Sequence, residues 1–216
     1  MTDRKIDSKK DHNTDDKKDH KKAGKKAGKM DAKILKKGVR LILEGLGEDP
    51  DSDRLAETPR RVSEMLMEVL GGTNRSPDEY LKALSEEKHE EMVILKDIPL
   101  YSMCEHHLLP FSGTCSIAYI PRQGKIMGFD TIAQLVDLLA KRLQIQERLT
   151  KEIAENLIKA MSPLGVVVII KAQHLCMIMR GAKKPGTITV TSAIRGIFRR
   201  KPATRAEAMS LLMAKE

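Results

Sequence analysis

The chain contains no tryptophan, and its three tyrosines and three phenylalanines make aromatic residues only 3% of the sequence. Proteins that bind single-stranded nucleic acid stack the bases on aromatic side chains, and this chain has too few for such a surface. The formal net charge of +9 is unevenly spread, because residues 1–29 hold eleven Lys and Arg against six Asp. A net charge of about +4 remains for the other residues, and we expect no nucleic-acid partner.

Long apolar runs are also lacking. No stretch approaches the roughly 18 apolar residues of a membrane-spanning helix, and the N-terminus lacks the apolar core of a secretory signal. The longest apolar run, residues 166–170, has the length of a buried strand. Only three cysteines are present, which favours metal ligands or free thiols over disulfides. We therefore expect a cytoplasmic protein with no membrane partner.

The N-terminal segment differs in composition from the rest. Residues 1–29 consist mainly of Lys, Asp, His, Gly and Ala, with a repeated Lys-Lys-Ala-Gly. Such a segment buries too little apolar surface to offset its chain entropy, so we expect a disordered tail, with a polyanion-binding arm as the alternative. We expect an N-terminal helical region over residues 30–90, a catalytic domain over 91–200 and a C-terminal helix over 201–216.

Periodicity and breakers predict the order of the elements. Helices are expected over about 34–45 and 58–70, followed by strands over 92–100 and 115–120. Two further helices, about 131–143 and 147–160, precede strands at 166–172 and about 187–192, and a short helix covers 204–214. This order predicts an α+β fold, an antiparallel sheet with helices on one face.

Two short clusters hold two of the three cysteines and three of the six histidines: Cys104-Glu105-His106-His107 and His174-Leu175-Cys176. Both fall in strand-to-strand connections, which can meet at one edge of the sheet. Cys104, His107 and Cys176 form the ligand set of a catalytic zinc site, in which a water fills the fourth position with its pKa lowered to about 7. The sequence therefore indicates hydrolysis.

The histidines beside these ligands leave two interpretations open. With three protein ligands and a water, His106 and His174 are available for proton transfer near neutral pH. Alternatively, one of them is the fourth ligand of a structural zinc site. Cys115 lies inside an expected strand, and we interpret it as a core residue.

Two further polar segments are candidates for substrate binding. Gln146 and Glu147 stand between two expected helices, and a carboxylate there can accept hydrogen bonds from a purine edge. Arg180, with Lys183 and Lys184, follows the second cluster and can hold an anion. The alternatives are an ordinary helix junction and a solvated loop.

Taken together, these residues resemble the GTP cyclohydrolase I family, zinc enzymes that open pteridine synthesis. The resemblance covers about residues 31–200. Its most specific parts are Cys-Glu-His-His-Leu-Leu-Pro-Phe at 104–111, Ala-Tyr-Ile-Pro at 118–121, Arg-Leu-Gln-Ile-Gln-Glu-Arg-Leu-Thr at 142–150 and His-Leu-Cys-Met-Ile-Met-Arg-Gly at 174–181. It implies the tunnelling fold, a four-stranded antiparallel sheet with two helices on one face. It also implies a homodecamer of two stacked pentameric rings, with active sites between subunits.

The resemblance also implies roles for matched positions. By this resemblance, Cys104, His107 and Cys176 would hold zinc, and His106 and His174 would transfer protons. Gln146 and Glu147 would anchor the guanine. Arg180 would contact the phosphates, together with Arg61 from a neighbouring subunit. The implied reaction is hydrolysis at C8 of GTP. C8 leaves as formate, and the product is 7,8-dihydroneopterin triphosphate.

One segment departs from the family. Where relatives usually have Ser-Lys-Leu-x-Arg, which helps to bind the triphosphate, this chain has Asp130-Thr131-Ile132-Ala133-Gln134. We expect Asp130 at the N-cap of the helix, where its carboxylate would occupy the N–H groups that bind anions. It would also repel a phosphate 4 Å away by about 1 kcal/mol or more. Residues that could compensate are Arg195, Arg199 and Arg200.

Three hypotheses follow. The first is GTP cyclohydrolase I activity with rearranged triphosphate contacts. The second is a paralogous cyclohydrolase whose guanine substrate has fewer phosphates or none, and comparable turnover of GTP and guanosine would support it. The third is a non-catalytic, zinc-containing ring scaffold, or a basic oligomer that binds polyanions through its tails. Release of formate from GTP would remove the third.

Overall fold

The computed structural model describes residues 28–81, 84–86 and 89–214, without the side chains of 84–86. The expected tail therefore lies outside the described residues, except for residues 28–29, as do the last two residues of the expected C-terminal helix. Among the described helices, none is long and apolar enough to cross a membrane. The elements in chain order are α1 (Ala32–Gly45), α2 (Thr58–Val69), η1 (Pro77–Glu79), β1 (Leu84–Glu86), β2 (Val93–Cys104), β3 (Pro110–Ile120), β4 (Lys125–Met127), α3 (Phe129–Ala140), β5 (Leu143–Gln144), α4 (Gln146–Met161), β6 (Gly165–His174), α5 (Leu175–Ile178), β7 (Thr189–Gly196), α6 (Ile197–Arg200) and α7 (Pro202–Met213).

The main sheet has the strand order β5-β2-β3-β6-β7. Its four long strands pair antiparallel, while the two-residue β5 pairs parallel to β2. The α+β class expected from the sequence is confirmed. The strands β2 and β3 are longer than expected, so the turn between them is only residues 105–109. Gly113 lies in the added part of β3. The strand needs glycine there, because a Cβ at this position would lie 1.9 Å from the Lys171 carbonyl oxygen.

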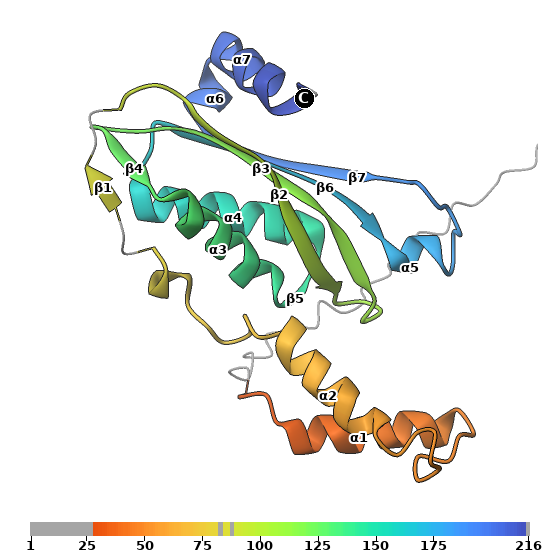
Figure 1. Cartoon of the computed structure of the whole chain (residues 1–216). Helices are drawn as coiled ribbons and strands as arrows, with labels where there is room; N and C mark the ends of the chain where they lie inside the picture. The colour runs from red at the N-terminus through yellow and green to blue at the C-terminus, as the bar shows by residue number, and fades with distance from the viewer. Residues whose placement is uncertain (1–27, 82–83, 87–88, 215–216) are drawn as a thin grey trace, which may run out of the picture.

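The helices α3 and α4 cover one face of the sheet (Figure 1). Alternate residues of β6 point to opposite faces, so Val166 and Val168 join the core beneath these helices, whereas Val167 and Ile169 point away from it. Both sets are buried, which explains why residues 166–170 form an uninterrupted apolar run. The main core contains Leu100, Phe111, Ile117, Ile132, Leu135, Leu149, Ile153 and Leu157.

The other face of the sheet is covered at one end by α6 and α7, a packing that the sequence pattern did not reveal (Figure 1). Phe198, Ala208 and Leu212 pack there against Val167 and Ile169. The sheet therefore has helices on both faces at the end distant from α5, and on one face near α5.

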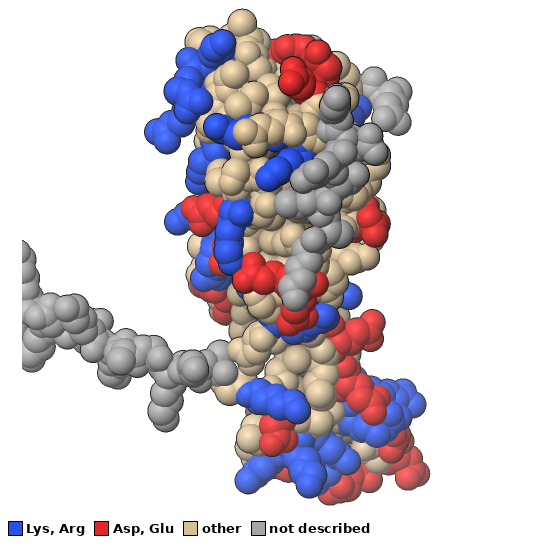
Figure 2. All heavy atoms as spheres, turned by 90° about the vertical axis from the view of Figure 1, so that its left-hand side faces the viewer, with Lys and Arg blue, Asp and Glu red and all other residues tan. Residues whose placement is uncertain are grey.

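The helices α1 and α2 form a pair below the sheet (Figure 1). Asp31 caps α1 by accepting hydrogen bonds from the backbone N–H groups of Lys33 and Ile34. Many large apolar side chains of the pair face solvent: Ile34, Leu41, Ile42, Leu46, Met65 and Met67. The ion pairs Arg40–Asp51, Arg54–Glu48 and Arg60–Glu64 mix both signs of charge over the pair, as the lower part of Figure 2 shows.

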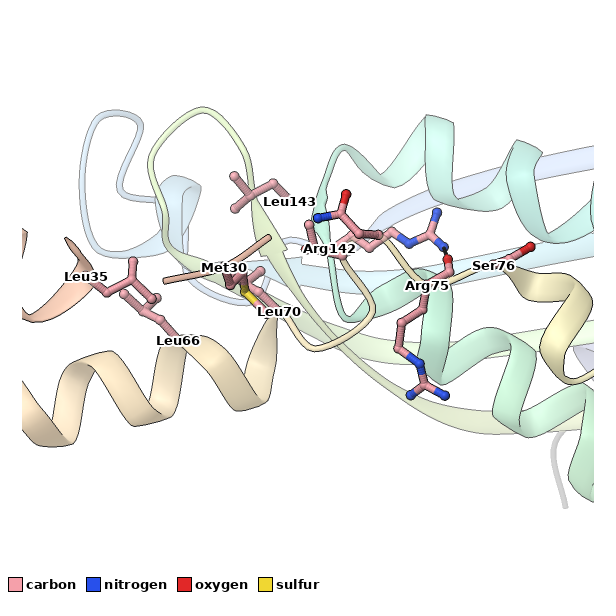
Figure 3. A pocket seen from close by; sticks show the side chains of 10 residues that line it. Met30, Leu35, Leu66, Leu70, Arg75, Ser76, Arg142 and Leu143 are labelled. Atoms are coloured by element: carbon pink, nitrogen blue, oxygen red, sulfur yellow. Dashed lines mark hydrogen bonds between the residues drawn. The ribbon is translucent and has the colours of Figure 1, made fainter. Parts of the chain in front are cut away.

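An apolar cleft of about 700 Å³ separates this pair from the sheet (Figure 3). Met30, Leu35, Leu66 and Leu70 line it on the helix side, and Leu143 on the side of the sheet. The pair is joined to the sheet region by hydrogen bonds from the backbone N–H of Gly72 to the carbonyl of Lys141 and from the Arg142 side chain to the carbonyl of Gly72. The helix pair is thus anchored at the C-terminal end of α2.

Candidate functional site

The register of the sheet brings the two sequence clusters together. Cys104 is the last residue of β2, and Phe111 near the start of β3 pairs with His174 at the end of β6. Because β3 and β6 run antiparallel, the turn at 105–109 and the short helix α5 leave the same edge of the sheet. Cys176 lies in α5, directly after β6.

The turn at 105–109 is held in a strained conformation. The backbone N–H of Cys104 donates to the Leu109 carbonyl, and the N–H of Leu108 donates to the Cys104 carbonyl, each at 2.9 Å. Leu108 adopts a φ of 51°, a left-handed conformation that is unfavourable for a side chain with a Cβ. This geometry carries His107 back toward the end of β2.

The three expected metal ligands lie together. The sulfurs of Cys104 and Cys176 and a ring nitrogen of His107 are all within 4.8 Å of one another. Tetrahedral zinc bonds of about 2.0–2.3 Å would bring such atoms to about 3.5 Å, so each distance between ligand atoms would shorten by at most about 1.3 Å. Cys104 is buried, Cys176 is half-buried and His107 is exposed. The donor set fits a metal ion and is reachable from solvent on the His107 side.

The electrostatics of the two thiols also fit a cation. Burial raises the pKa of Cys176, and the adjacent Cys104 raises that pKa further, while the positive charge of Arg180 lowers it. Two neighbouring thiolates are unfavourable without a positive charge between them. A bound divalent cation reverses this balance, since a coordinating thiol loses its proton.

His174 lies beside this group in a partly buried position. Its ring stacks on Phe111 at a centroid distance of 4.6 Å and an interplanar angle of 11°. Burial lowers the pKa of His174, and the charge of Glu147 partly opposes that shift. The environment of His174 therefore favours the neutral imidazole.

Gln146 determines how His174 is oriented. The Gln146 side-chain amide donates to the Ile170 carbonyl, the Thr189 carbonyl and Thr191 Oγ1, at 3.0–3.1 Å. These acceptors identify the amide nitrogen, so the Gln146 oxygen is the atom 2.7 Å from His174 Nε2 and must accept its proton. Gln146 was expected to face a purine, yet it is only 1% exposed and hydrogen-bonded within the chain.

Glu147 is the exposed neighbour of Gln146 in the first turn of α4. It lines a pocket of about 230 Å³ together with Thr191, Ser192 and Arg195. A carboxylate in the first turn of a helix is also favoured by the helix dipole. Glu147 is therefore the carboxylate at this position that a ligand can reach.

The remaining residues of the two clusters surround the metal group. Arg180 Nη1 lies 2.7 Å from His107 Nε2, and because arginine only donates, this nitrogen of His107 accepts. His106 is exposed, with Nδ1 3.9 Å from Cys104 Sγ and Nε2 3.9 Å from a carboxylate oxygen of Glu105. A positive charge and an exposed imidazole thus lie on the solvent side of the group.

The structure does not bring Arg61 to this group within one chain. Arg61 is exposed near the start of α2, about eight residues or 12 Å along the helix from the end that is anchored to the sheet region. Among the described residues, its side chain has no hydrogen bond or ion pair.

The segment that departs from the family also lies far from the metal group. Ser102 Oγ donates to the Ala140 carbonyl at 2.7 Å, so the C-terminal end of α3 is the end near the group. Asp130 is ten residues, or about 15 Å, away along the helix. The expectation that Asp130 is the N-cap was wrong: Gly128 is the N-cap, α3 has no side-chain cap, and the exposed Asp130 is the second helical residue.

Sequence reasoning missed two kinds of contact around the group. The stacking of Phe111 on His174 was not expected. The signal for it was the position of Phe111 just across the turn from Cys104, near the start of the next strand. The hydrogen bonds of Arg148 and Gln144 to Glu105 were not expected, because they join residues about 40 positions apart. No local pattern could have revealed them.

Comparison with known proteins assigns the family. The sequence profile described as GTP cyclohydrolase I matches residues 35–213. The chain belongs to the GTP cyclohydrolase I family. The GTP cyclohydrolase 1 of Thermoanaerobacter pseudethanolicus is 54% identical over 87% of this chain and 100% of its own length. That of Caldanaerobacter subterraneus is 54% identical over 86% and 99%.

A solved structure is also similar in part. The apo crystal structure of the archaeosine synthase QueF-Like matches 49% of this chain and 93% of its own, with 22% identity and a TM-score of 0.37. That likeness is too slight to add to the assignment to the GTP cyclohydrolase I family, which rests on the sequence matches.

Proposed function

We propose that this protein is a hydrolase of the GTP cyclohydrolase I type, which converts GTP and one net water into formate and 7,8-dihydroneopterin triphosphate. The observation that carries the proposal is the assembly of Cys104, His107 and Cys176 at one sheet edge, with two histidines beside them, in a member of this family. The reaction breaks cyclic amidine C–N bonds of the guanine imidazole ring.

We assign the resident metal as zinc, held by Cys104, His107 and Cys176. Two sulfurs and one imidazole are the ligands zinc prefers, and three protein ligands are typical of its catalytic sites. When bound, zinc supplies an acidified water at neutral pH and polarises the bond under attack. The chain itself supplies the shape, the substrate contacts and the proton-transfer groups.

Substrate recognition is assigned to the residues at the start of α4 and after α5. Glu147 presents an exposed carboxylate that can accept hydrogen bonds from two guanine N–H groups. The buried Gln146 supports this end of the purine site by fixing His174, rather than by direct contact through its side chain. Arg180, exposed and two residues beyond α5, is the contact for a phosphate oxygen.

Proton transfer is assigned to His174 and His106. The Nε2 proton of His174 is donated to Gln146, which leaves Nδ1 as the nitrogen that accepts a proton from the reacting centre. A lowered pKa keeps His174 neutral and ready to act as a base. The exposed His106 can return a proton when the ring opens and formate leaves.

A second copy of the chain completes the site in this proposal. Arg61 does not reach the metal group of its own chain, and the helix pair exposes Ile34, Leu41, Ile42 and Leu46. Burial of that apolar surface against another subunit would favour assembly. We therefore propose the tunnelling-fold ring, a homodecamer of two pentamers, and a cytoplasmic location where thiols stay reduced.

A related substrate is the second candidate. Asp130 is exposed in the first turn of α3, and its carboxylate would repel an anion bound at that helix terminus. Thr131 and Gln134 carry no charge, so they do not offer the attraction that lysine and arginine would. This observation favours a guanine compound with fewer phosphates, such as GMP or guanosine.

One experiment separates these functions. Zinc-loaded protein is incubated in parallel with GTP, GMP and guanosine, and formate and the fluorescent oxidised pterin are measured. Turnover of GTP with little turnover of guanosine is the expected result. If guanosine were turned over as fast as GTP, the substrate would be a guanine compound with fewer phosphates or none. Absence of formate from all three would remove the hydrolase assignment in favour of a non-catalytic zinc scaffold.

A further inference from the structure

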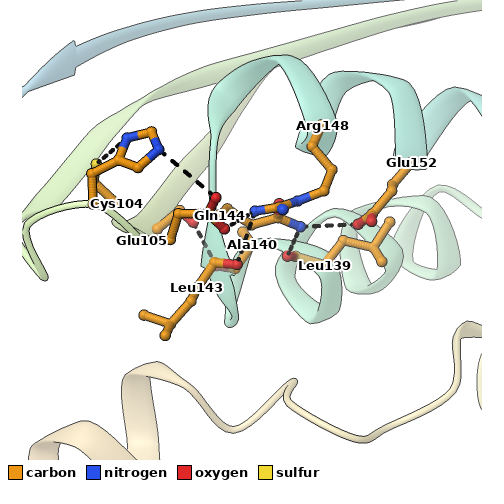
Figure 4. A network of polar contacts seen from close by, with 10 residues as sticks. Cys104, Glu105, Leu139, Ala140, Leu143, Gln144, Arg148 and Glu152 are labelled. Atoms are coloured by element: carbon orange, nitrogen blue, oxygen red, sulfur yellow. Dashed lines mark hydrogen bonds and ion pairs between the residues drawn. The ribbon is translucent and has the colours of Figure 1, made fainter. Parts of the chain in front are cut away.

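The metal-bearing turn is tied to α4 by a polar network that no assigned role includes (Figure 4). The Arg148 guanidinium donates through Nη2 to the Glu105 carboxylate and through Nε to Gln144 Oε1, the latter at 2.9 Å. Glu105 follows the ligand Cys104 directly, and its backbone N–H donates to the Gln144 carbonyl at 3.0 Å. Both the side chain and the backbone of Glu105 are therefore held.

The network extends inward and is fixed at its far end. Gln144 is 1% exposed, and its amide donates to the Leu139 carbonyl at 3.2 Å and to a Glu152 carboxylate oxygen at 2.9 Å. Its amide is oriented by these two acceptors, so its oxygen is the atom that faces Arg148. Arg148 cannot move away from Gln144 without leaving a buried carbonyl oxygen unpaired.

The same helical turn also holds the second ligand-bearing segment. Gln146, two residues before Arg148, accepts from His174 at 2.7 Å, and His174 immediately precedes the helix that carries Cys176. One turn of α4 therefore contacts the segment of Cys104 and His107 through Arg148, and the segment of Cys176 through Gln146. These two segments are about 70 residues apart in the sequence.

We propose that Arg148 is a positioning residue of the metal centre: by holding Glu105, it sets the distance of Cys104 and His107 from Cys176. The proposal rests on the zinc site of the proposed function. Arg148 forms no hydrogen bond or ion pair with the three metal ligands, and it does not line the pocket of Glu147. It acts through the turn that it holds, as residues around a metal site orient the ligands.

The proposal requires arginine and not merely a positive charge. The Nε and Nη2 groups of Arg148 bond to two different partners at once, which the single ammonium group of lysine cannot reproduce in the same directions. Arg148→Lys is therefore expected to retain the charge and lose part of the positioning. Arg148→Met loses both while keeping much of the apolar stem.

The test compares metal affinity in full-length variants. Zinc affinity is measured by competition with a chromophoric chelator, and cobalt(II) is loaded separately to record its absorption bands, which report the coordination geometry. Arg40→Met is the matched control, because Arg40 on α1 is about as exposed as Arg148 and also forms an ion pair, with Asp51 in the following loop. For Arg148→Met, zinc affinity should fall about 10- to 100-fold relative to wild type. The affinity of Arg148→Lys should lie between those of wild type and Arg148→Met. The cobalt spectrum should shift, and at saturating zinc kcat should fall more than KM for GTP rises.

The outcomes distinguish this proposal from the proposed function. If Arg148→Met had the same zinc affinity and cobalt spectrum as Arg40→Met, the positioning role would be overturned. The proposed function would still stand if the wild-type protein were active. Wild-type protein that binds no zinc would overturn the metal centre and the positioning role together. If Arg148→Met does not fold, Glu105→Gln takes its place, because it keeps the shape and removes the charge. Unchanged affinity in that variant would equally contradict the proposal.

Discussion

The sheet with α3 and α4 and the pair α1–α2 differ in how completely one chain buries them. In the sheet region, Leu100, Ile132 and Leu149 are fully buried, and the metal group is assembled from one chain. In the helix pair, Ile42 and Leu46 remain 62% and 73% exposed. The groups that could hold a metal ion thus lie in the self-contained region, and Arg61 lies in the region with an uncovered apolar face.

This difference separates two requirements for activity. A metal centre built within one chain should survive disassembly, whereas substrate binding that uses Arg61 of another subunit should not. Changes in the helix pair should therefore lower turnover while the metal content is retained, whereas changes at the metal group should lower both.

The largest effect should come from breaking the metal group. Cys176→Ala should lower kcat/KM for formate release more than about 100-fold, because loss of mere supporting contacts already costs 10–100-fold in metal affinity. Bound zinc, measured by atomic absorption, should fall with it. Cys115→Ala is the control: it should keep zinc and lower the unfolding free energy by about 1 kcal/mol. Equal zinc in both variants would contradict the assignment of Cys176.

The next effect should come from the uncovered face of the helix pair. Ile42→Glu combined with Leu46→Glu should weaken assembly by at least about tenfold per side chain, since burying such a side chain contributes about 1.5–3 kcal/mol. Sedimentation velocity measures the assembly. The exposed Lys37 provides a control on the same helix, and Lys37→Glu should leave assembly intact. An unaltered oligomer in the double variant would show that this face is not an interface.

A smaller effect is expected at the start of α3. Asp130→Ser combined with Gln134→Arg removes a negative charge and adds a positive one, which is worth about 1 kcal/mol or more at 4 Å from a phosphate. Steady-state kinetics should show a rise of about five- to tenfold in kcat/KM for GTP and no change for guanosine. An equal rise for both substrates would indicate that α3 does not contact the phosphates.

The smallest effect concerns thiol reactivity. Cys115 is fully buried, and burial raises its pKa far above the usual range, so the reactive thiolate is not populated in the folded protein. In metal-free protein at pH 8, the half-buried Cys176 should react with a chromogenic disulfide in the folded state, and Cys115 only after unfolding in guanidinium. Three fast thiols in the folded protein would contradict the burial of Cys115.

The sequence predicted those features that depend on nearby residues. Helical periodicity located α1, α2, α3 and α4, and the two Cys/His clusters indicated the metal group because each is confined to a few positions. The α+β class followed from the order of the elements. In these cases the chemistry of a short segment determines its structure.

Features that depend on distant contacts were not predictable in this way. The burial of Gln146 arises because Ile170, Thr189 and Thr191 meet it from β6 and β7. Similarly, the packing of α7 on the second face of the sheet depends on Val167 and Ile169. Their apolar character is equally consistent with a strand inside a sheet that has helices on one face. The cap of α3 was misplaced by two residues, because Gly128 offered no side-chain signal.

We expect one metal ion, held by Cys104, His107 and Cys176 of one chain, to be required for hydrolysis of GTP. The most direct test titrates zinc into metal-free protein and measures the rate of formate release from GTP at each addition. The rate of formate release should rise linearly with added zinc and level off at one zinc per chain. Full activity before any zinc is added, or a rise that continues to two zinc ions per chain, would contradict it.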